Sequence, residues 1–132
     1  MKTDIELKDD VYAWLKGSPL MEAVSGSLCT RMRPIDSDKE DVVISVLANN
    51  FAQKQSAIVQ VNIYVKDIKY NGRNEENTKR IRELARIACD YMESKIKDYR
   101  ITINAQRIIA VDSIGYHVIN NKLLYQYINE HE

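Results

Sequence analysis

The chain has only two histidines, His117 and His131, the residue type most often used in acid–base catalysis. His117 lies in an extended apolar segment near Asp112, a setting in which half-buried packing is favoured over an acid–base role. His131 lies among the polar C-terminal residues and is expected to be inert. A transition-metal site would need another histidine or a cysteine at ligand spacing, and none is present. The histidines therefore predict neither catalysis nor a metal site.

Four acidic residues between positions 36 and 41 resemble a loop for a hard cation: Asp36, Asp38, Glu40 and Asp41. Their spacing lacks the glycine and the terminal glutamate of an EF-hand loop, so an exposed, solvated connection is expected. The sequence has only four glycines and no GxxxxGK[ST], GxGxxG or GxSxG pattern. No cofactor is expected.

The two cysteines, Cys29 and Cys89, are far apart and lack the CxxC spacing of zinc sites. We interpret both as small buried hydrophobic residues of a protein in a reducing compartment. Cys89 falls on the apolar side of a predicted helix without a neighbouring base, so a nucleophilic role is not expected.

The net charge argues against a domain dedicated to binding nucleic acid. Lys plus Arg (19) balance Asp plus Glu (19), whereas domains dedicated to nucleic acids usually have a basic excess. A basic strip at positions 80, 82 and 86 is interspersed with Glu83 and Asp90, a pattern that predicts ion pairs along a helix. No sequence-specific nucleic-acid partner is expected. A near-zero net charge is also compatible with self-association.

Two short helices are predicted at the start of the chain. Thr3-Asp4-Ile5-Glu6 fits a capping box. Apolar residues then recur at helical spacing as far as Leu15, and Gly17 ends the helix. Ser18-Pro19 supplies an N-cap and a first-turn proline for the second helix.

Three strands are predicted next, over 27–33, 42–48 and 57–65. Pro34 ends the first, and the second is apolar at nearly every position, as in a covered or central strand. A hairpin loop with a lone Phe51 is expected over 49–56. The third strand alternates, with Gln60, Asn62 and Tyr64 on its polar face. Its other face is apolar: Ala57, Val59, Val61, Ile63 and Val65.

A polar loop over 66–73, with a turn at Tyr70-Asn71-Gly72, is predicted to precede one long amphipathic helix from Asn74 to about Lys97. Asn74 is the expected N-cap. Strands are predicted over 101–111 and 116–128 on either side of a turn at 112–115. Asn120-Asn121 is compatible with a turn or with a bulge in one long strand, and we favour one strand.

These elements predict a single α+β domain over residues 1–132. An antiparallel sheet of about four to five strands would pack against one long helix, with two short N-terminal helices. No apolar run reaches the ~20 residues needed to span a bilayer, so no membrane partner is expected. The charged N-terminus, Met1 to Glu6, lacks the apolar stretch of a secretory signal, which favours a cytoplasmic location.

The layout resembles that of the tail-completion or tail-terminator proteins of long-tailed bacteriophages, which are common in prophages. The features that carry the resemblance are the opening helix, Arg33-Pro34 before the second strand, VQVNIYV at 59–65 and HVINN at 117–121. The resemblance covers nearly the whole chain, although each motif is short.

This resemblance implies a non-catalytic α+β subunit that assembles with copies of itself into a ring, commonly a hexamer, at the head-proximal end of the tail. The ring would stop tail-tube polymerisation and offer a surface for the head connector. Tail-tube and head-connector proteins would then be its partners. The protein would reside in the host cytoplasm during assembly and afterwards in the virion tail.

Loops and sheet edges are expected to form the ring contacts. The residues proposed for this interface are Phe51, Gln60, Asn62, Tyr64, Tyr70 and Arg73. Tyrosines on strands are enriched at interfaces but also pair across strands within one sheet: Tyr64, Tyr116, Tyr125 and Tyr127.

Two other functions remain open from sequence. The first is a small-molecule-binding or regulatory module that holds its ligand between helix and sheet. The second is an enzyme that uses His117 and the acidic loop.

Overall fold

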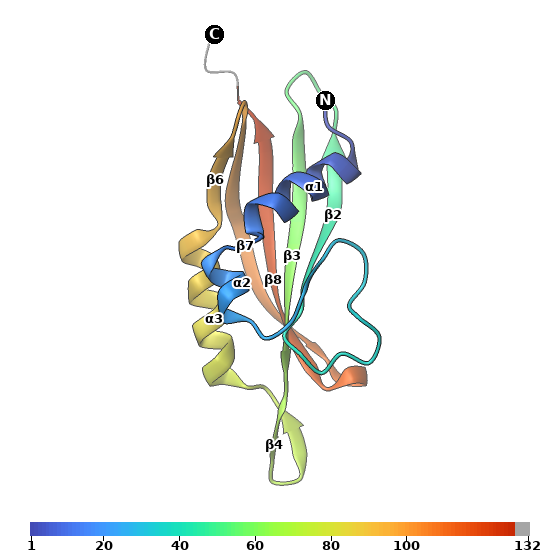
Figure 1. Cartoon of the computed structure of the whole chain (residues 1–132), viewed down its shortest axis with the longest axis vertical. Coiled ribbons are helices and arrows are strands. Elements are labelled where there is room, and N and C mark those ends of the chain that lie inside the picture. The colour runs from blue at the N-terminus through green and yellow to red at the C-terminus, as the bar shows by residue number, and fades with distance from the viewer. Residues whose placement is uncertain (129–132) are drawn as a thin grey trace.

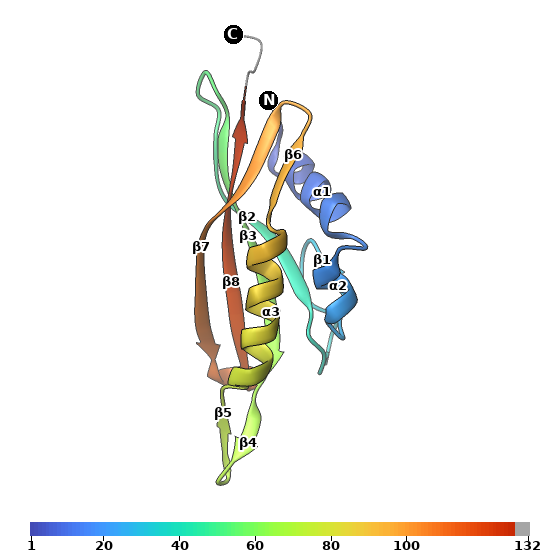
Figure 2. The same cartoon turned by 90° about the vertical axis from the view of Figure 1, so that its left-hand side faces the viewer.

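Six strands form one mixed, strongly curled sheet, a half-barrel whose concave side is covered by three helices (Figures 1 and 2). A separate two-stranded hairpin projects from one end of the molecule (Figure 1). This computed structural model describes residues 1–128. The elements are α1 (Asp4–Leu15), α2 (Pro19–Ala23), β1 (Leu28–Cys29), β2 (Val42–Asn50), β3 (Ser56–Lys66), β4 (Ile68–Tyr70), β5 (Arg73–Glu75), α3 (Thr78–Tyr91), β6 (Glu93–Ile96), β7 (Tyr99–Val111), the 3₁₀ turn η1 (Asp112–Ile114) and β8 (Tyr116–Tyr127).

The α+β class is confirmed. The predicted sheet, antiparallel and of about four to five strands, differs from the observed one, which has six strands and one parallel pair. The strand order is β1-β2-β3-β8-β7-β6, with β1 parallel to β2 and all other neighbours antiparallel. The strand predicted over 27–33 shrinks to Leu28–Cys29. Beyond Cys29 the chain leaves the sheet as a connection, residues 30–41, which we call the strap. Contacts with distant residues, described below, hold the strap in place. They prevail over the local preference for a strand over 30–33.

The predicted long helix is wrong at both ends. The helix α3 covers only Thr78–Tyr91, and its N-cap is Asn77, whose side chain accepts a hydrogen bond from the Arg80 backbone N–H. Asn74 instead lies in β5, within a hairpin that replaces the predicted polar loop. The predicted turn at its tip is confirmed, because Asn71 and Gly72 both have positive φ angles (51° and 77°).

The C-terminal end of the predicted helix becomes the edge strand β6. Met92 caps α3, and a turn at Lys97 (φ 51°) then folds β6 back onto β7. Ile96 pairs with Tyr99 across this turn and so completes the sheet edge instead of a helical arc. Local helical periodicity was overridden here by pairing with a strand that follows in the chain.

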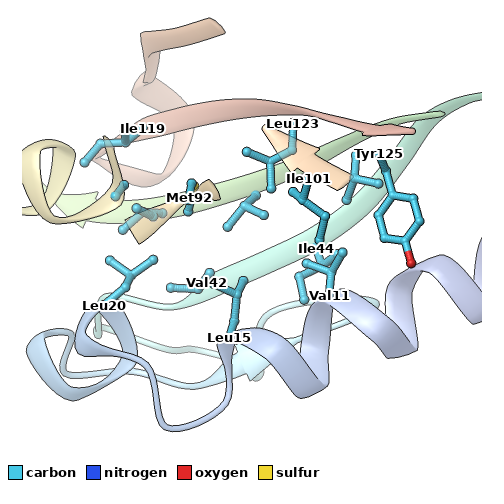
Figure 3. Packing of buried hydrophobic residues seen from close by; sticks show 14 of the residues in the cluster. Val11, Leu15, Leu20, Val42, Ile44, Met92, Ile101, Ile119, Leu123 and Tyr125 are labelled. Carbon is cyan, nitrogen blue, oxygen red and sulfur yellow. The ribbon is translucent and has the colours of Figure 1, made fainter. Parts of the chain in front are cut away.

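Both N-terminal helices are confirmed, including the Thr3–Glu6 capping box and the Ser18 N-cap. Their contribution to the core exceeds the prediction, since α1 buries Leu7, Val11 and Leu15 completely. Figure 3 shows Val11 and Leu15 directed at the sheet, next to Ile44 and Val42 of β2. Three helices rather than one therefore cover the concave face. No helix within residues 1–128 has the length and apolar character needed to cross a membrane.

The centre of the sheet follows the predicted alternation. Every second side chain of β3 is buried and faces the helices: Ala57, Val59, Val61, Ile63 and Val65. The strand β8 is continuous, and Asn120 and Asn121 stay in register with Asn62 and Val61. The favoured single strand is thus confirmed, without a turn at these asparagines. The opposite, convex face of the sheet carries the alternate residues of β3 and β8.

Two β-bulges lie at the same level of the sheet and explain its curl. One interrupts β2 between Val46 and Ala48, and the other interrupts β7 between Ile103 and Ala105. Val46 and Ile103 belong to one cross-strand row through Val59 and Leu123. An extra residue in a strand bends it and increases its twist, so both sides of the sheet turn inward at this row.

Gly26 leaves no room for a side chain, so Gly26→Ala is expected to destabilise the fold by about 1–3 kcal/mol. An added Cβ would lie 2.5 Å from the backbone oxygen of Glu40 and closer still to the Asp41 carboxylate. A glycine-to-alanine change usually stabilises a compatible site through the unfolded state. Chemical denaturation of the wild type and of Gly26→Ala measures the difference in their free energies of unfolding. A variant as stable as the wild type would show that the strap moves aside at no cost.

Candidate assembly surfaces

The six residues predicted for the interface fall in three places. Phe51, 52% exposed, lies just beyond β2 at one end of the long axis, and Tyr70 and Arg73 lie on the β4–β5 hairpin at the other end (Figure 1). Gln60 and Asn62, together with Tyr64, lie on the convex face of β3. One contact surface cannot contain all six, because the two end groups are separated by the length of the sheet.

On the convex face, three amides form one hydrogen-bonded cluster. The side-chain nitrogen of Asn120 donates to Gln60 Oε1 at 2.9 Å and to Asn62 Oδ1 at 2.6 Å. Asn120 is only 4% exposed, so the cluster is held firmly at the sheet surface. These bonds occupy the acceptor oxygens of Gln60 and Asn62 and leave their N–H donors without a partner within residues 1–128.

Tyr64 is covered by the strap. The Arg33 guanidinium lies 4.4 Å from the ring centre of Tyr64 and 4.3 Å from that of Tyr116, and the two rings meet edge to face. The Tyr116 hydroxyl donates to the backbone oxygen of Ser37 at 3.2 Å. The aromatic pair therefore anchors the strap on the convex face, and sequence alone gave no sign of this contact.

The acidic loop is only partly the solvated connection that was predicted. Asp41 has 1% side-chain exposure and accepts hydrogen bonds from Ser27 N–H, Ser37 Oγ and Arg33 Nε, at 2.9, 2.6 and 2.9 Å. Burial opposes ionisation, but the hydrogen bonds from Ser37 and Ser27 and the ion pair with Arg33 together hold the pKa of Asp41 below its usual range. Only Asp36 and Asp38 behave as predicted.

Glu40 also has a structural partner. Its carboxylate binds Arg80 at 2.6 and 2.8 Å, and the same guanidinium donates to the backbone oxygen of Ala23 at 2.6 Å. The hydrogen bond with Glu40 raises the pKa of Arg80 further above its ordinary value. The predicted ion pairs along α3 are confirmed as well, from Arg80 to Glu83 and from Arg86 to Asp90.

His117 pairs with Asp67 instead of the nearby Asp112. Its Nδ1 lies 2.6 Å from Asp67 Oδ1, and the side chains are 17% and 4% exposed. The Asp67 backbone N–H also donates to Gly115, so this pair fixes the base of the β4–β5 hairpin. Residues 1–128 contain no group of three or more His, Cys, Asp or Glu side chains arranged to hold a metal ion. The other histidine, His131, lies outside the described residues.

A buried amide that sequence analysis missed holds the N-terminus. Gln55 is 3% exposed; its Oε1 accepts from the Lys2 backbone N–H and the Tyr99 hydroxyl, at 2.8 and 3.0 Å. Its Nε2 donates to Lys2 O and Asn49 Oδ1, both at 2.7 Å. The fully buried Tyr125 extends this network through Lys2, because its hydroxyl accepts from Lys2 Nζ at 3.3 Å and donates to Asp10 at 2.7 Å. Figure 3 shows this hydroxyl directed toward α1.

The tyrosines at this end of the sheet pair across strands. The ring of Tyr99 lies 5.1 Å from that of Tyr125 and 5.4 Å from that of Tyr127. The Tyr125 hydroxyl donates to Asp10, and burial together with this carboxylate raises its pKa. Cross-strand packing is thereby confirmed for Tyr125, which is inaccessible to a partner.

The sequence predicts that sheet edges form ring contacts, but it does not identify β2 and β7 as the strands with free edges. The strand β1 covers only Val42 and Val43 of β2, and β6 covers only residues 99–102 of β7. The rest of β2 and β7 has no strand on its outer side within the described residues. Exposed apolar residues mark both edges: Leu47 at 56%, Ile108 at 41% and Ile109 at 39%. The apolar run at 108–111, within the strand predicted over 101–111, was the sequence feature that could have indicated an exposed apolar edge.

The space between α3 and the sheet is occupied by internal contacts. Gln106 donates to Asn121 Oδ1 at 2.8 Å and to the backbone oxygen of Ala85 at 3.2 Å, which closes the inner end of this interface. On the outside, Cys89 and Gln106 line a surface groove of about 490 Å³, and the second cysteine, Cys29, is also half-buried. A ligand held between helix and sheet, the alternative that sequence leaves open, would have to displace these bonds.

No protein-family model matches the chain, and no curated protein sequence matches it.

Proposed function

We propose that this chain is a non-catalytic structural subunit that self-assembles into a closed ring, the role of tail-completion and tail-terminator proteins in long-tailed phages. The observation that carries the proposal is the pair of free edges on the curled sheet. An unpaired edge presents backbone N–H and C=O groups to another chain, and proteins usually protect such edges.

The two edges are complementary in direction. Because each neighbour in the series β2-β3-β8-β7 is antiparallel, β7 runs opposite to β2. The β7 edge of one copy can therefore pair with the β2 edge of the next and continue the antiparallel order. Such a contact is heterologous, and it closes into a ring when the rotation per subunit divides a full turn.

Side chains on these edges support the same contact. Ile108 and Ile109 project from opposite faces of β7, and both are substantially exposed. Leu47 is exposed at the bulge of β2. Exposed apolar residues on an unpaired edge favour pairing with another strand, and Arg107 is the charged residue that flanks this run on β7. In a ring these residues would become buried.

The tail role itself rests on the resemblance in element order. In that role, the two ends of the long axis would contact different neighbours, the tail tube and the head connector. Phe51 lies at one end and Tyr70 with Arg73 at the other, so exposed aromatic residues are available at both ends (Figure 1).

Light-scattering mass over a concentration series, with negative-stain imaging, tests the proposal. The wild type is expected to form rings of about six subunits, the number that the family resemblance implies, held by sheet edges. Ile108→Lys combined with Ile109→Lys is expected to yield monomers, because two charges on the β7 edge oppose strand pairing.

Ile68→Lys is the matched control, since Ile68 is 45% exposed but lies on the β4–β5 hairpin away from both edges. It should leave the mass unchanged. A wild type that stays monomeric at all concentrations, or a ring that the β7 double variant leaves intact, would contradict assembly through the edges.

A further inference from the structure

The charges of the sheet are distributed unequally between its two faces. The four long strands β2, β3, β7 and β8 contain no aspartate or glutamate. They contain four Lys or Arg residues: Lys66, Arg100, Arg107 and Lys122. Although the net charge of the chain is zero, every Lys, Arg, Asp or Glu residue in the four long strands is a Lys or Arg.

All four cations lie on the convex face. Lys66 and Lys122 pair in register with Tyr116 and Gln60, and both positions alternate with the buried residues of β3 and β8. Arg100 and Arg107 pair with Gln126 and Asn120 on the same side of β8. Within residues 1–128 none of the four side chains takes part in an ion pair or hydrogen bond. The three helices occupy the other face (Figure 2).

The cations form a row along the strands. Arg107 and Lys122 lie on adjacent strands and are offset by two residues of β8, or roughly 7 Å. Lys66 and Arg100 extend the row beyond them, and the register spans ten residues of β8, from 116 to 126, or about 33 Å. The length of the row is therefore close to one turn of duplex DNA, ~34 Å.

Two amide side chains beside Arg107 and Lys122 add hydrogen-bond donors to this face. Because Asn120 occupies the acceptor oxygens of Gln60 and Asn62, their free amide hydrogens lie beside Arg107 and Lys122. The long strands give this face cations and N–H donors and no carboxylate, a combination complementary to a partner rich in anionic acceptors. The carboxylates that adjoin the face belong to Glu93 of β6, in register with Thr102, and to Asp36 and Asp38 of the strap. A linear row is complementary to a linear polyanion more than to the scattered carboxylates of a protein surface.

We propose that this convex cationic face binds the phosphate backbone of duplex DNA without reading its sequence. Phosphate contacts alone position a protein on a duplex but carry no sequence information. The proposal is independent of ring formation, since every residue it uses lies within one copy. It also explains why net charge gave no sign of nucleic-acid binding: the compensating acidic residues lie outside the long strands.

Fluorescence anisotropy with a labelled random-sequence duplex of about 30 bp, titrated at several salt concentrations, tests the proposal. Three to four phosphate contacts predict a slope of log K against log salt of about −3. Between ~50 and ~200 mM salt this slope corresponds to a loss of affinity of roughly 60-fold. Arg107→Ala with Lys122→Ala should reduce the steepness of the slope by about two.

The matched control is Arg82→Ala with Arg86→Ala, which removes the same charge from the exposed side of α3. It should bind DNA like the wild type. Arg107→Gln with Lys122→Gln keeps side-chain bulk and repeats the test should the alanine variant unfold. The proposal would be overturned if the convex-face variant and the α3 variant lost DNA affinity equally, or if the wild type bound DNA no tighter than the convex-face variant. It would also be overturned if the convex-face variant changed only the oligomeric mass.

Discussion

Asp41→Ala is expected to lower the free energy of unfolding by about 3–5 kcal/mol, the cost typical of removing one partner from a buried ion pair. Asp41 has 1% side-chain exposure, and Arg33, its partner at 2.9 Å, has 15%. The variant would leave this guanidinium with carbonyl acceptors but no counter-ion, and would leave the Ser27 N–H without its acceptor. Because Arg33 also lies over Tyr64 and Tyr116, the strap should detach from the convex face.

The effect of Asp41 should depend on pH in a defined direction. Its pKa in the folded state is lower than in the unfolded state, so the carboxylate stabilises the fold fully above the unfolded value of about 4. This stabilisation is lost as the pH falls through the folded value. The difference between wild type and variant should therefore be full at neutral pH and shrink in acid.

Urea denaturation of both proteins at neutral and acidic pH measures this difference. Asp38→Ala is the control, because Asp38 is an exposed residue of the same strap and should change stability by no more than about 0.5 kcal/mol. If Asp41→Ala were as mild as Asp38→Ala, the strap would contribute little to the stability of the fold.

Gln55→Ala is expected to cost about 2–4 kcal/mol, since a buried amide would be removed and the groups that bond to it would lose a hydrogen-bond partner. The Lys2 backbone N–H and the Tyr99 hydroxyl both donate to Gln55 Oε1, in a site of 3% exposure. Gln55 also bonds the Lys2 carbonyl, so its loss should release the segment that precedes α1. Stability should fall, and the amides of the first turn of α1 should lose protection from hydrogen exchange.

Gln53→Ala, at an exposed position of the same loop, provides the control and should change neither measurement. Equal protection of α1 amides in the Gln55 variant would mean that Leu7 and Val11 anchor the helix without help from the loop.

Sequence patterns succeeded where structure is local. The alternation of β3 repeats every two residues, and the caps at Thr3 and Ser18 involve residues only three positions apart. The turn at Asn71-Gly72 follows from the left-handed backbone that these residue types tolerate. Such features depend on neighbours in the chain, which a sequence displays directly.

The predictions that failed concern segments whose structure depends on residues far away in the chain. The fate of residues 92–97 depended on pairing with β7, and the strap depended on Arg33 reaching Asp41 and two distant tyrosines. His117 pairs with Asp67, fifty residues away in the chain, and not with the nearby Asp112. Neither hydrophobic period nor propensity encodes such contacts, because long-range pairing decides strand formation as much as local preference.

The sequence by itself determined an α+β chain with capped N-terminal helices, a central alternating strand and an amphipathic helix. It also placed polar residues such as Gln60, Asn62 and Arg107 on strands. Only the tertiary structure decided that β2 and β7 end in free edges and that the unpaired strand cations share one convex face. Edges and faces are properties of several strands together, so they exist only once register and strand order are fixed.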